Sequence, residues 1–126
     1  MRAAIAVTLI AVLTMTCTHA EEVDHNSELK GKAVQCKGLT FFFAADGCSI
    51  QEWIARGGHY IMYDVLILSS ASGPNELVYA TNKIGGVYED WFKFKWENGV
   101  WKLYMWMPSV AGLPGYWRCH GTCTVT

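Results

Sequence analysis

The residues best suited to bind another molecule are aromatic and basic side chains that alternate within residues 90–107. They are Trp91, Lys93, Lys95, Lys102, Tyr104 and Trp106. Indole and phenol rings stack on nucleic-acid bases or on the apolar faces of sugars, and lysine ammonium groups pair with phosphate or carboxylate. If the six side chains share one face of a sheet, they predict a binding surface. The alternative is an ordinary solvated face, on which the lysine stems cover the rings.

Groups that could transfer protons are fewer. His59 stands at the start of an apolar run, and Glu89 and Asp90 precede the aromatic segment. A ribonuclease-type transphosphorylation needs a base, an acid and a cation held together. His59 with Glu89 or Asp90 is the only catalytic arrangement that the sequence suggests, and we favour a protein without catalytic residues. We expect no metal and no cofactor, because no metal-ligand spacing and no phosphate-binding loop occurs.

A β-hairpin over residues 90–107 would position the aromatic and basic side chains. Asn98-Gly99 suits a two-residue turn, because both positions of such a turn need positive φ. Side chains alternate between the two faces of a strand, so the turn also sets which residues face the core. The expected inward-facing pairs are Trp96 with Trp101, Phe94 with Leu103, and Phe92 with Met105.

The rest of the chain predicts an α+β fold. A short helix is expected over 50–56, because Ser49 and Glu52 have the spacing of a capping box and Gly57-Gly58 could end the helix. Further strands are expected at 32–43, 60–68, 77–81 and 116–119, where β-branched and aromatic residues are bounded by turn residues. The predicted architecture is one short helix packed against an antiparallel sheet of about five strands, stabilised by disulfides.

The N-terminus has the features of an exported protein. Arg2, an apolar run and Thr18-His19-Ala20 predict a signal peptide over residues 1–20. Residues 21–31 are predicted to be a flexible acidic segment, and residues 32–126 a single secreted domain.

Cysteines remaining after removal of the signal peptide predict two disulfides. They are Cys36, Cys48, Cys119 and Cys123. An even number of cysteines in a small exported chain is typical of a disulfide framework, and three pairings are possible. We favour a long-range pairing of Cys36 with the C-terminal pair, because closing a long loop removes about 4–5 kcal/mol of unfolded-state entropy.

The run Cys36-Lys37-Gly38-Leu39-Thr40-Phe41, followed by a short helix, several strands and a C-terminal cysteine, resembles a known family. It resembles the ribonuclease-like secreted effectors of plant-pathogenic fungi, which are similar to guanyl-specific fungal ribonucleases without their active site. Trp91 and Trp106 stand near the positions where those enzymes carry an arginine and a histidine. The resemblance implies binding of RNA or a host protein without turnover, and pairing of Cys36 with Cys119 or Cys123.

These observations together predict a secreted, extracellular, non-enzymatic binding protein of the virulence-effector type, able to enter host cells. Its expected partner is RNA or a host protein, it is expected to be a monomer, and no membrane partner is expected. One alternative is a small secreted ribonuclease. Another is a β-rich binder of a sugar or a small apolar ligand, because 52% of the residues are hydrophobic and could line a pocket.

Overall fold

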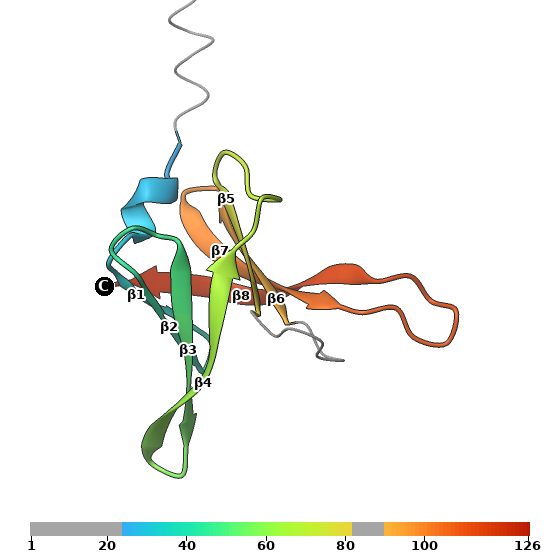
Figure 1. Ribbon diagram of the computed structural model, residues 1–126, viewed down its shortest axis with the longest axis horizontal. Helices are drawn as coiled ribbons and strands as arrows, with labels where there is room; N and C mark the ends of the chain where they lie inside the picture. Colours follow the sequence, from blue (N-terminus) through green and yellow to red (C-terminus); the bar gives the residue numbers. More distant parts are fainter. Residues whose placement is uncertain (1–23, 82–89) are drawn as a thin grey trace, which may run out of the picture.

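Eight antiparallel strands form a closed barrel in the computed structural model, which describes residues 24–81 and 90–126 (Figure 1). Each strand pairs with the next along the chain, and β8 pairs with β1 to close the barrel. One turn of 3₁₀ helix, η1 (Asn26–Leu29), precedes the first strand. The strands are β1 (Ala33–Cys36), β2 (Leu39–Phe43), β3 (Ser49–Arg56), β4 (His59–Leu68), β5 (Glu76–Thr81), β6 (Trp91–Glu97), β7 (Val100–Met107) and β8 (Tyr116–Val125).

This all-β barrel shows that the predicted α+β fold was wrong. The segment expected to be a helix forms β3, in which Ile50 and Glu52 are buried and their neighbours are more exposed. A period of two is the pattern of a strand. Gly57 and Gly58 have φ values of 59° and 80° and form the turn between β3 and β4 instead of ending a helix. Pairing with β2 on one side and β4 on the other outweighs the local capping signal.

The number of strands also differs from the prediction of about five. The segment 32–43 was expected to be one strand and forms two, β1 and β2. Lys37 and Gly38, with φ values of 43° and 84°, turn the chain between them. A two-residue turn with positive φ at both positions favours a tight hairpin, so this segment folds back on itself.

The predicted hairpin is confirmed. Asn98 and Gly99 have φ values of 51° and 80° and connect β6 to β7. The expected register is present, with Trp96 opposite Trp101, Phe94 opposite Leu103, and Phe92 opposite Met105. Phe92, Phe94, Trp101 and Leu103 are buried, so this face of the hairpin belongs to the core.

Aromatic side chains fill the barrel interior. Phe94 makes edge-to-face contacts with Phe41 and Phe43, at centroid distances of 5.1 and 5.0 Å. Phe43 contacts Tyr79 in the same way, at 5.5 Å. The Tyr79 hydroxyl donates a 2.7 Å hydrogen bond to the carbonyl oxygen of Gly47, which satisfies its one buried polar group. A small apolar ligand would therefore have to displace packed rings to enter this region.

One disulfide closes the barrel between its first and last strands. Cys36 and Cys123 are opposite each other on β1 and β8 and are bonded, with 87 residues between them. The predicted long-range pairing is thus confirmed. The second predicted disulfide was wrong, because Cys48 and Cys119 are both free and exposed. Cys48 lies in the β2–β3 turn and Cys119 lies in β8, and β1 stands between β2 and β8.

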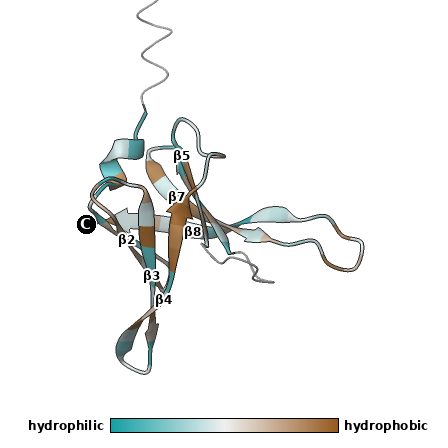
Figure 2. Cartoon of the chain, viewed as in Figure 1, coloured by the Kyte–Doolittle hydropathy of each residue, from teal (hydrophilic) through white to brown (hydrophobic). Residues whose placement is uncertain are grey.

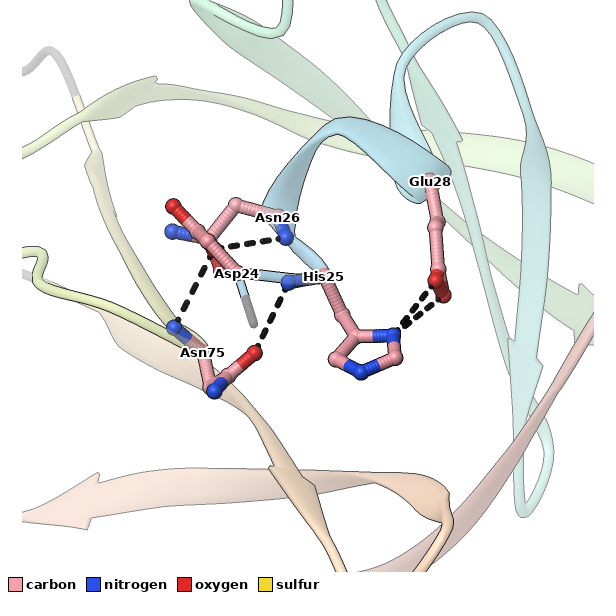
Figure 3. Close-up of polar contacts among 5 residues, drawn as sticks. All are labelled: Asp24, His25, Asn26, Glu28 and Asn75. Carbon is pink, nitrogen blue, oxygen red and sulfur yellow. Dashed lines mark hydrogen bonds and ion pairs between the residues drawn. The ribbon is translucent and has the colours of Figure 1, made fainter. Parts of the chain in front are cut away.

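The described residues before β1 pack against the barrel. Within the segment 21–31, for which the sequence predicts flexibility, residues 24–31 are described, and η1 buries Leu29 in the core. Figure 3 shows the polar contacts with the β4–β5 loop: the His25 N–H donates to Asn75 Oδ1 at 2.8 Å, and the Asn75 N–H donates to Asp24 Oδ1 at 3.3 Å. The His25 ring stacks on Trp96 at 4.2 Å. These contacts cover one end of the barrel. The predicted signal peptide lies outside the described residues.

Two hairpins extend beyond the barrel body. Figure 1 shows the β3–β4 hairpin and the β7–β8 hairpin projecting in different directions. Each contains an irregularity in its ladder, between Glu52 and Trp53 in one and between Leu103 and Tyr104 in the other. Bulges of this kind bend and twist a strand pair. In the part of the chain that the structure describes, no helix is long and apolar enough to cross a membrane.

Candidate functional site

The structure places the six predicted aromatic and basic residues on one outer face, formed by β6 and β7. Lys93 is opposite Tyr104, and Lys95 is opposite Lys102. The neighbouring strands extend this face on both sides: Val78 of β5 pairs with Lys93, and Cys119 of β8 pairs with Tyr104. The alternation that buries Phe92 and Phe94 turns the residues between them outward.

Three tryptophans line a shallow cleft on this face. Trp91, Trp106 and Trp117 come from β6, β7 and β8, and they enclose a volume of about 350 Å³. We call this the tryptophan cleft. Trp106 and Trp117 are opposite each other in the ladder, and their rings meet at 5.3 Å with an interplanar angle of 66°. Trp106 is 37% exposed, so part of its ring is available to another molecule.

Lys93 stands at the border of the tryptophan cleft. Its ammonium nitrogen lies 4.4 Å from the centroid of the Trp117 ring and 3.1 Å from Glu76 Oε1. It is also 5.8 Å from the Tyr104 ring. A cation over an aromatic face is attracted by the electron-rich ring, and here it also fixes the position of that ring. Lys93 is therefore already paired, and Lys95 and Lys102 carry the less committed charges of this face.

Tyr104 and Glu97 are linked on the same face. The Tyr104 hydroxyl donates a hydrogen bond to Glu97 Oε1. This bond raises the pKa of Tyr104 to about 12. It also lowers the pKa of Glu97, and the neighbouring lysines Lys95 and Lys102 lower it further. At neutral pH the pair consists of a phenol and a carboxylate, so the face offers a hydrogen-bond acceptor beside its cations.

Gly115 supports the position of the Trp106 ring. A Cβ atom at residue 115 would lie 2.4 Å from Cζ2 of Trp106 and 3.1 Å from the carbonyl oxygen of Met107. Only a residue without a side chain fits this close approach. The indole of Trp106 is thus held between the backbone of Gly115 and the ring of Trp117.

Trp117 was missed by the sequence reasoning. The strand expected at 116–119 was not assigned a neighbour, so its tryptophan had no place on the aromatic face. The structure pairs it with Trp106 across β7 and β8. Pairing the predicted last strand with the second strand of the hairpin would have found it, because the two are consecutive strands separated by a loop.

The catalytic candidates lie on different elements. His59 begins β4 and is exposed opposite Arg56, at the tip of the β3–β4 hairpin. Asp90 precedes β6 and is joined to Thr81 by two hydrogen bonds: the Thr81 N–H donates to the carbonyl oxygen of Asp90 at 3.1 Å, and the Asp90 N–H donates to Thr81 Oγ1 at 3.3 Å. Glu89 lies outside the described residues. In the part of the chain that the structure describes, no hydrogen bond or ion pair joins His59 to Asp90, so the two do not form an acid–base pair.

A buried carboxylate, which the sequence analysis assigned to a helix cap, lies inside the barrel. Glu52 is only 4% exposed, and its Oε1 has no hydrogen-bond partner among the described residues. It is opposite Asp64 in the β3–β4 ladder. Burial, followed by the charges of Asp90 and Asp64, raises the pKa of Glu52 to about 7. Because Glu52 is buried, it cannot touch a bound molecule. Its raised pKa instead makes the stability of the fold depend on pH.

A second groove lies on the outer face of β1, β2 and β3. Its volume is about 430 Å³, and it is lined by Ala33, Gln35, Thr40, Phe42, Trp53 and Tyr60. Trp53 and Phe42 meet edge to face at 5.9 Å, and the Trp53 indole N–H donates to Gln51 at 3.1 Å. It contains aromatic rings and neutral polar groups but no charged side chain, so it differs chemically from the tryptophan cleft.

Comparisons of the chain with protein-family models, curated proteins and solved structures gave no match. The resemblance to ribonuclease-like effectors therefore stays a prediction, and the helix that formed part of its layout is strand β3. Among residues 24–81 and 90–126, no group of three or more histidine, cysteine, aspartate or glutamate side chains is arranged to hold a metal ion.

Proposed function

We propose that the protein is a non-enzymatic carbohydrate-binding protein and that the tryptophan cleft is its binding site. The observation that carries the proposal is the meeting of Trp91, Trp106 and Trp117 on one outer face, beside Lys93. A pyranose ring has an apolar face of C–H groups and a rim of hydroxyls. The apolar face packs on an indole, and the hydroxyls need polar partners at the edge of the stack.

Further polar partners lie along the same outer face: Lys95 and Lys102 are four residues from Trp91 and Trp106 on their strands, about 13 Å away, so they can reach only an oligosaccharide that extends along β6 and β7. Lys95 and Lys102 can donate to hydroxyl oxygens or pair with the carboxylate of an acidic sugar. Glu97 can accept a hydrogen bond from a sugar hydroxyl, since its pKa is lowered and it remains ionised. A site with a few polar groups at the border of an aromatic surface is typical of small-ligand recognition.

The packing of the interior supports a site on the outside. Eight-stranded barrels can hold one small ligand in their centre. Here Phe41, Phe43, Phe94 and Tyr79 occupy that space. This favours the sugar-binding alternative of the sequence analysis over a binder of small apolar ligands enclosed in the barrel.

RNA is the competing ligand, because bases also stack on tryptophan and Lys95 and Lys102 could meet phosphates. The charge of the protein makes RNA less favoured than a carbohydrate as the ligand. The full chain has a formal net charge of −1, and Lys93 is neutralised by Glu76. Binding to nucleic acid draws most of its affinity from several simultaneous phosphate contacts, and this face offers few uncommitted cations.

The test is an array of neutral and acidic oligosaccharides, followed by titration of the best one with tryptophan fluorescence as the signal. We expect Trp106→Ala to weaken binding by roughly 10- to 100-fold, because a stacked ring contributes about 1–3 kcal/mol. The matched control is Trp53→Ala, which removes a partly buried outer tryptophan in the second groove. It should leave the affinity unchanged.

Three results would contradict the proposal. An array without any binding, together with a gel shift of total RNA that is lost in Trp106→Ala, would assign the cleft to RNA. Loss of sugar binding in Trp53→Ala but not in Trp106→Ala would move the site to the second groove. Cleavage of the RNA in the same assay would show an enzyme and direct attention to His59 and Asp90.

A further inference from the structure

The loop between β7 and β8 exposes apolar side chains at its tip. Figure 1 shows this hairpin projecting from the barrel, and Figure 2 shows hydrophobic residues at its end. Val110 is 65% exposed and Leu113 is 70% exposed, which are the highest values among the large hydrophobic residues that the structure describes. The two residues are opposite each other in an isolated bridge, so their side chains lie on the same side of the tip. Exposed apolar side chains gathered in this way usually mark an interaction site.

The tip is held by its own hydrogen bonds. Ala111 and Gly112 have φ values of 48° and 83°, the conformation of a tight two-residue turn. On either side of this turn, the Val110 N–H donates to the carbonyl oxygen of Leu113 at 3.2 Å, and the Leu113 N–H donates to that of Val110 at 2.8 Å. The two apolar side chains are thus presented together before any partner binds, which lowers the entropy lost on binding.

The backbone of this loop is suited to a partner that offers no hydrogen bonds. Hydrocarbon cannot pair with a backbone N–H or C=O group, so a segment that enters a bilayer must satisfy these groups internally. Val110 and Leu113 do so with each other. Pro108 and Pro114 have no N–H group to satisfy. A protein partner could supply hydrogen bonds of its own and would not require such a loop, so the backbone favours lipid.

The outer part of the hairpin also carries no ionisable acidic or basic side chain. Between Lys102 of β7 and Arg118 of β8 the sequence contains no aspartate, glutamate, lysine, arginine or histidine. A charged side chain near the tip would oppose entry into hydrocarbon. A protein-binding surface, in contrast, usually has a polar rim around its apolar centre. The composition of this loop therefore agrees with its backbone in favouring a lipid partner.

Aromatic and basic side chains follow the tip in the order that suits a membrane surface. Tyr116, opposite Met107, is 56% exposed and lies three residues from Leu113, about 10 Å along an extended strand. Tyrosine and tryptophan concentrate at the level of the lipid headgroups, and a surface-bound apolar element enters a bilayer to a depth of about 5–10 Å. Arg118 is two residues further along β8 and is exposed, so its guanidinium can pair with a lipid phosphate.

We infer that the tip of the β7–β8 hairpin docks on the surface of a phospholipid bilayer. Val110 and Leu113 enter the hydrocarbon just below the headgroups, Tyr116 lies among the headgroups, and the barrel stays in water. The association is weak and reversible, because even a myristoyl chain, which buries more apolar surface, gives only marginal binding. This surface departs from the expectation of no membrane partner. It does not depend on the proposed sugar site, since Val110 and Leu113 do not line the tryptophan cleft.

Flotation of the purified protein with phosphatidylcholine vesicles tests the inference, at lipid concentrations up to about 5 mM. We expect part of the protein to float with the vesicles. Leu113→Asp should lower the partition coefficient by at least about tenfold, because it replaces the burial of a leucine by the insertion of a charge. The matched control is Ile61→Asp, which adds the same charge at a 49% exposed residue of the other projecting hairpin. It should leave the partition coefficient unchanged.

A variant that keeps the tip apolar locates it in the bilayer. Leu113→Trp should still bind, and phospholipids brominated in their acyl chains should quench the fluorescence of the added tryptophan. Leu113→Asp should have the unfolding midpoint of the wild type, because Leu113 is exposed, and the same affinity for a free oligosaccharide. Loss of vesicle binding is then separate from loss of the fold and from the sugar site.

A protein that does not float at the highest lipid concentration would overturn the inference. So would vesicle binding that persists in Leu113→Asp, or that Ile61→Asp lowers to the same extent, because both would place the contact elsewhere. Binding of Leu113→Trp without quenching by the brominated lipids would also overturn it, since the tip would then lie outside the hydrocarbon.

Discussion

The buried carboxylate of Glu52 makes the free energy of unfolding depend on pH. Its pKa rises from an ordinary value of 4.5 to about 7, first because of burial and then because of the charges of Asp90 and Asp64. Between these two pH values the folded protein binds more protons than the unfolded chain, so the free energy of unfolding falls as the pH rises. The fall is complete above pH 7 and amounts to about 3 kcal/mol, since one pKa unit corresponds to about 1.4 kcal/mol.

Replacing Glu52 with glutamine should remove this fall. The amide has the shape of the protonated carboxyl and never ionises, so Glu52→Gln and the wild type should have similar stability near pH 4.5. At pH 8 the variant should be more stable by about 3 kcal/mol. For a domain of this size that is a large fraction of a total stability of about 5–15 kcal/mol. Urea denaturation followed by tryptophan fluorescence at half-unit pH intervals measures the difference.

Taking the difference between the two proteins cancels the titration of groups that do not interact with Glu52. Glu76→Gln is the control: it removes a carboxylate that is paired with Lys93 at 3.1 Å. We expect this variant to change the stability by a similar amount at every pH from 5.5 to 8. A difference between Glu52→Gln and the wild type that stays constant from pH 4.5 to 8 would refute the reasoning, because it would mean that water reaches the carboxylate and keeps its pKa at the ordinary value.

Two further variants test the disulfide and the support of the tryptophan cleft. Cys123→Ser breaks the bond to Cys36 between the first and last strands and should lower the free energy of unfolding by about 2–5 kcal/mol, as measured by urea denaturation. The control Cys48→Ser, at a free and exposed thiol, should lower it by almost nothing. Equal losses of stability in the two variants would argue against the closure of the barrel by this bond. Gly115→Ala would place a Cβ atom 2.4 Å from the Trp106 ring. This variant should shift the tryptophan fluorescence emission and weaken ligand binding, with little change in the unfolding midpoint. An unchanged affinity would show that the position of the ring is not important for binding.

The β6–β7 hairpin shows how much of the structure the local sequence pattern predicts. Its turn, its register and its core face were predictable, because Asn98 and Gly99 favour positive φ and because alternation of apolar and polar residues assigns each side chain to a face. The placement of Lys93 and Tyr104 together on the outside follows from the same two facts. The role of Lys93 was not predictable, since Glu76 and Trp117, which engage it, belong to β5 and β8.

The segment 49–56 shows where local pattern fails. Ser49, Glu52 and the glycines at 57 and 58 satisfy the signals for a capped helix, and the same residues fit a strand that ends in a tight turn. Short apolar segments are ambiguous in this way. The neighbouring strands β2 and β4 decide the outcome, because they offer a ladder on both sides.

By itself the sequence determined the features that depend on neighbours along the chain: the hairpin around Asn98-Gly99, the strand character of most segments, and the pattern of inward-facing aromatic residues. Tertiary structure alone decided the features that join distant residues. These are the closure of the barrel by β1 and β8, the choice of Cys123 as the partner of Cys36, and the addition of Trp117 to the cleft. The physical reason is that a strand carries the same alternation whichever strand lies beside it, so its partner is selected only when the whole core is packed.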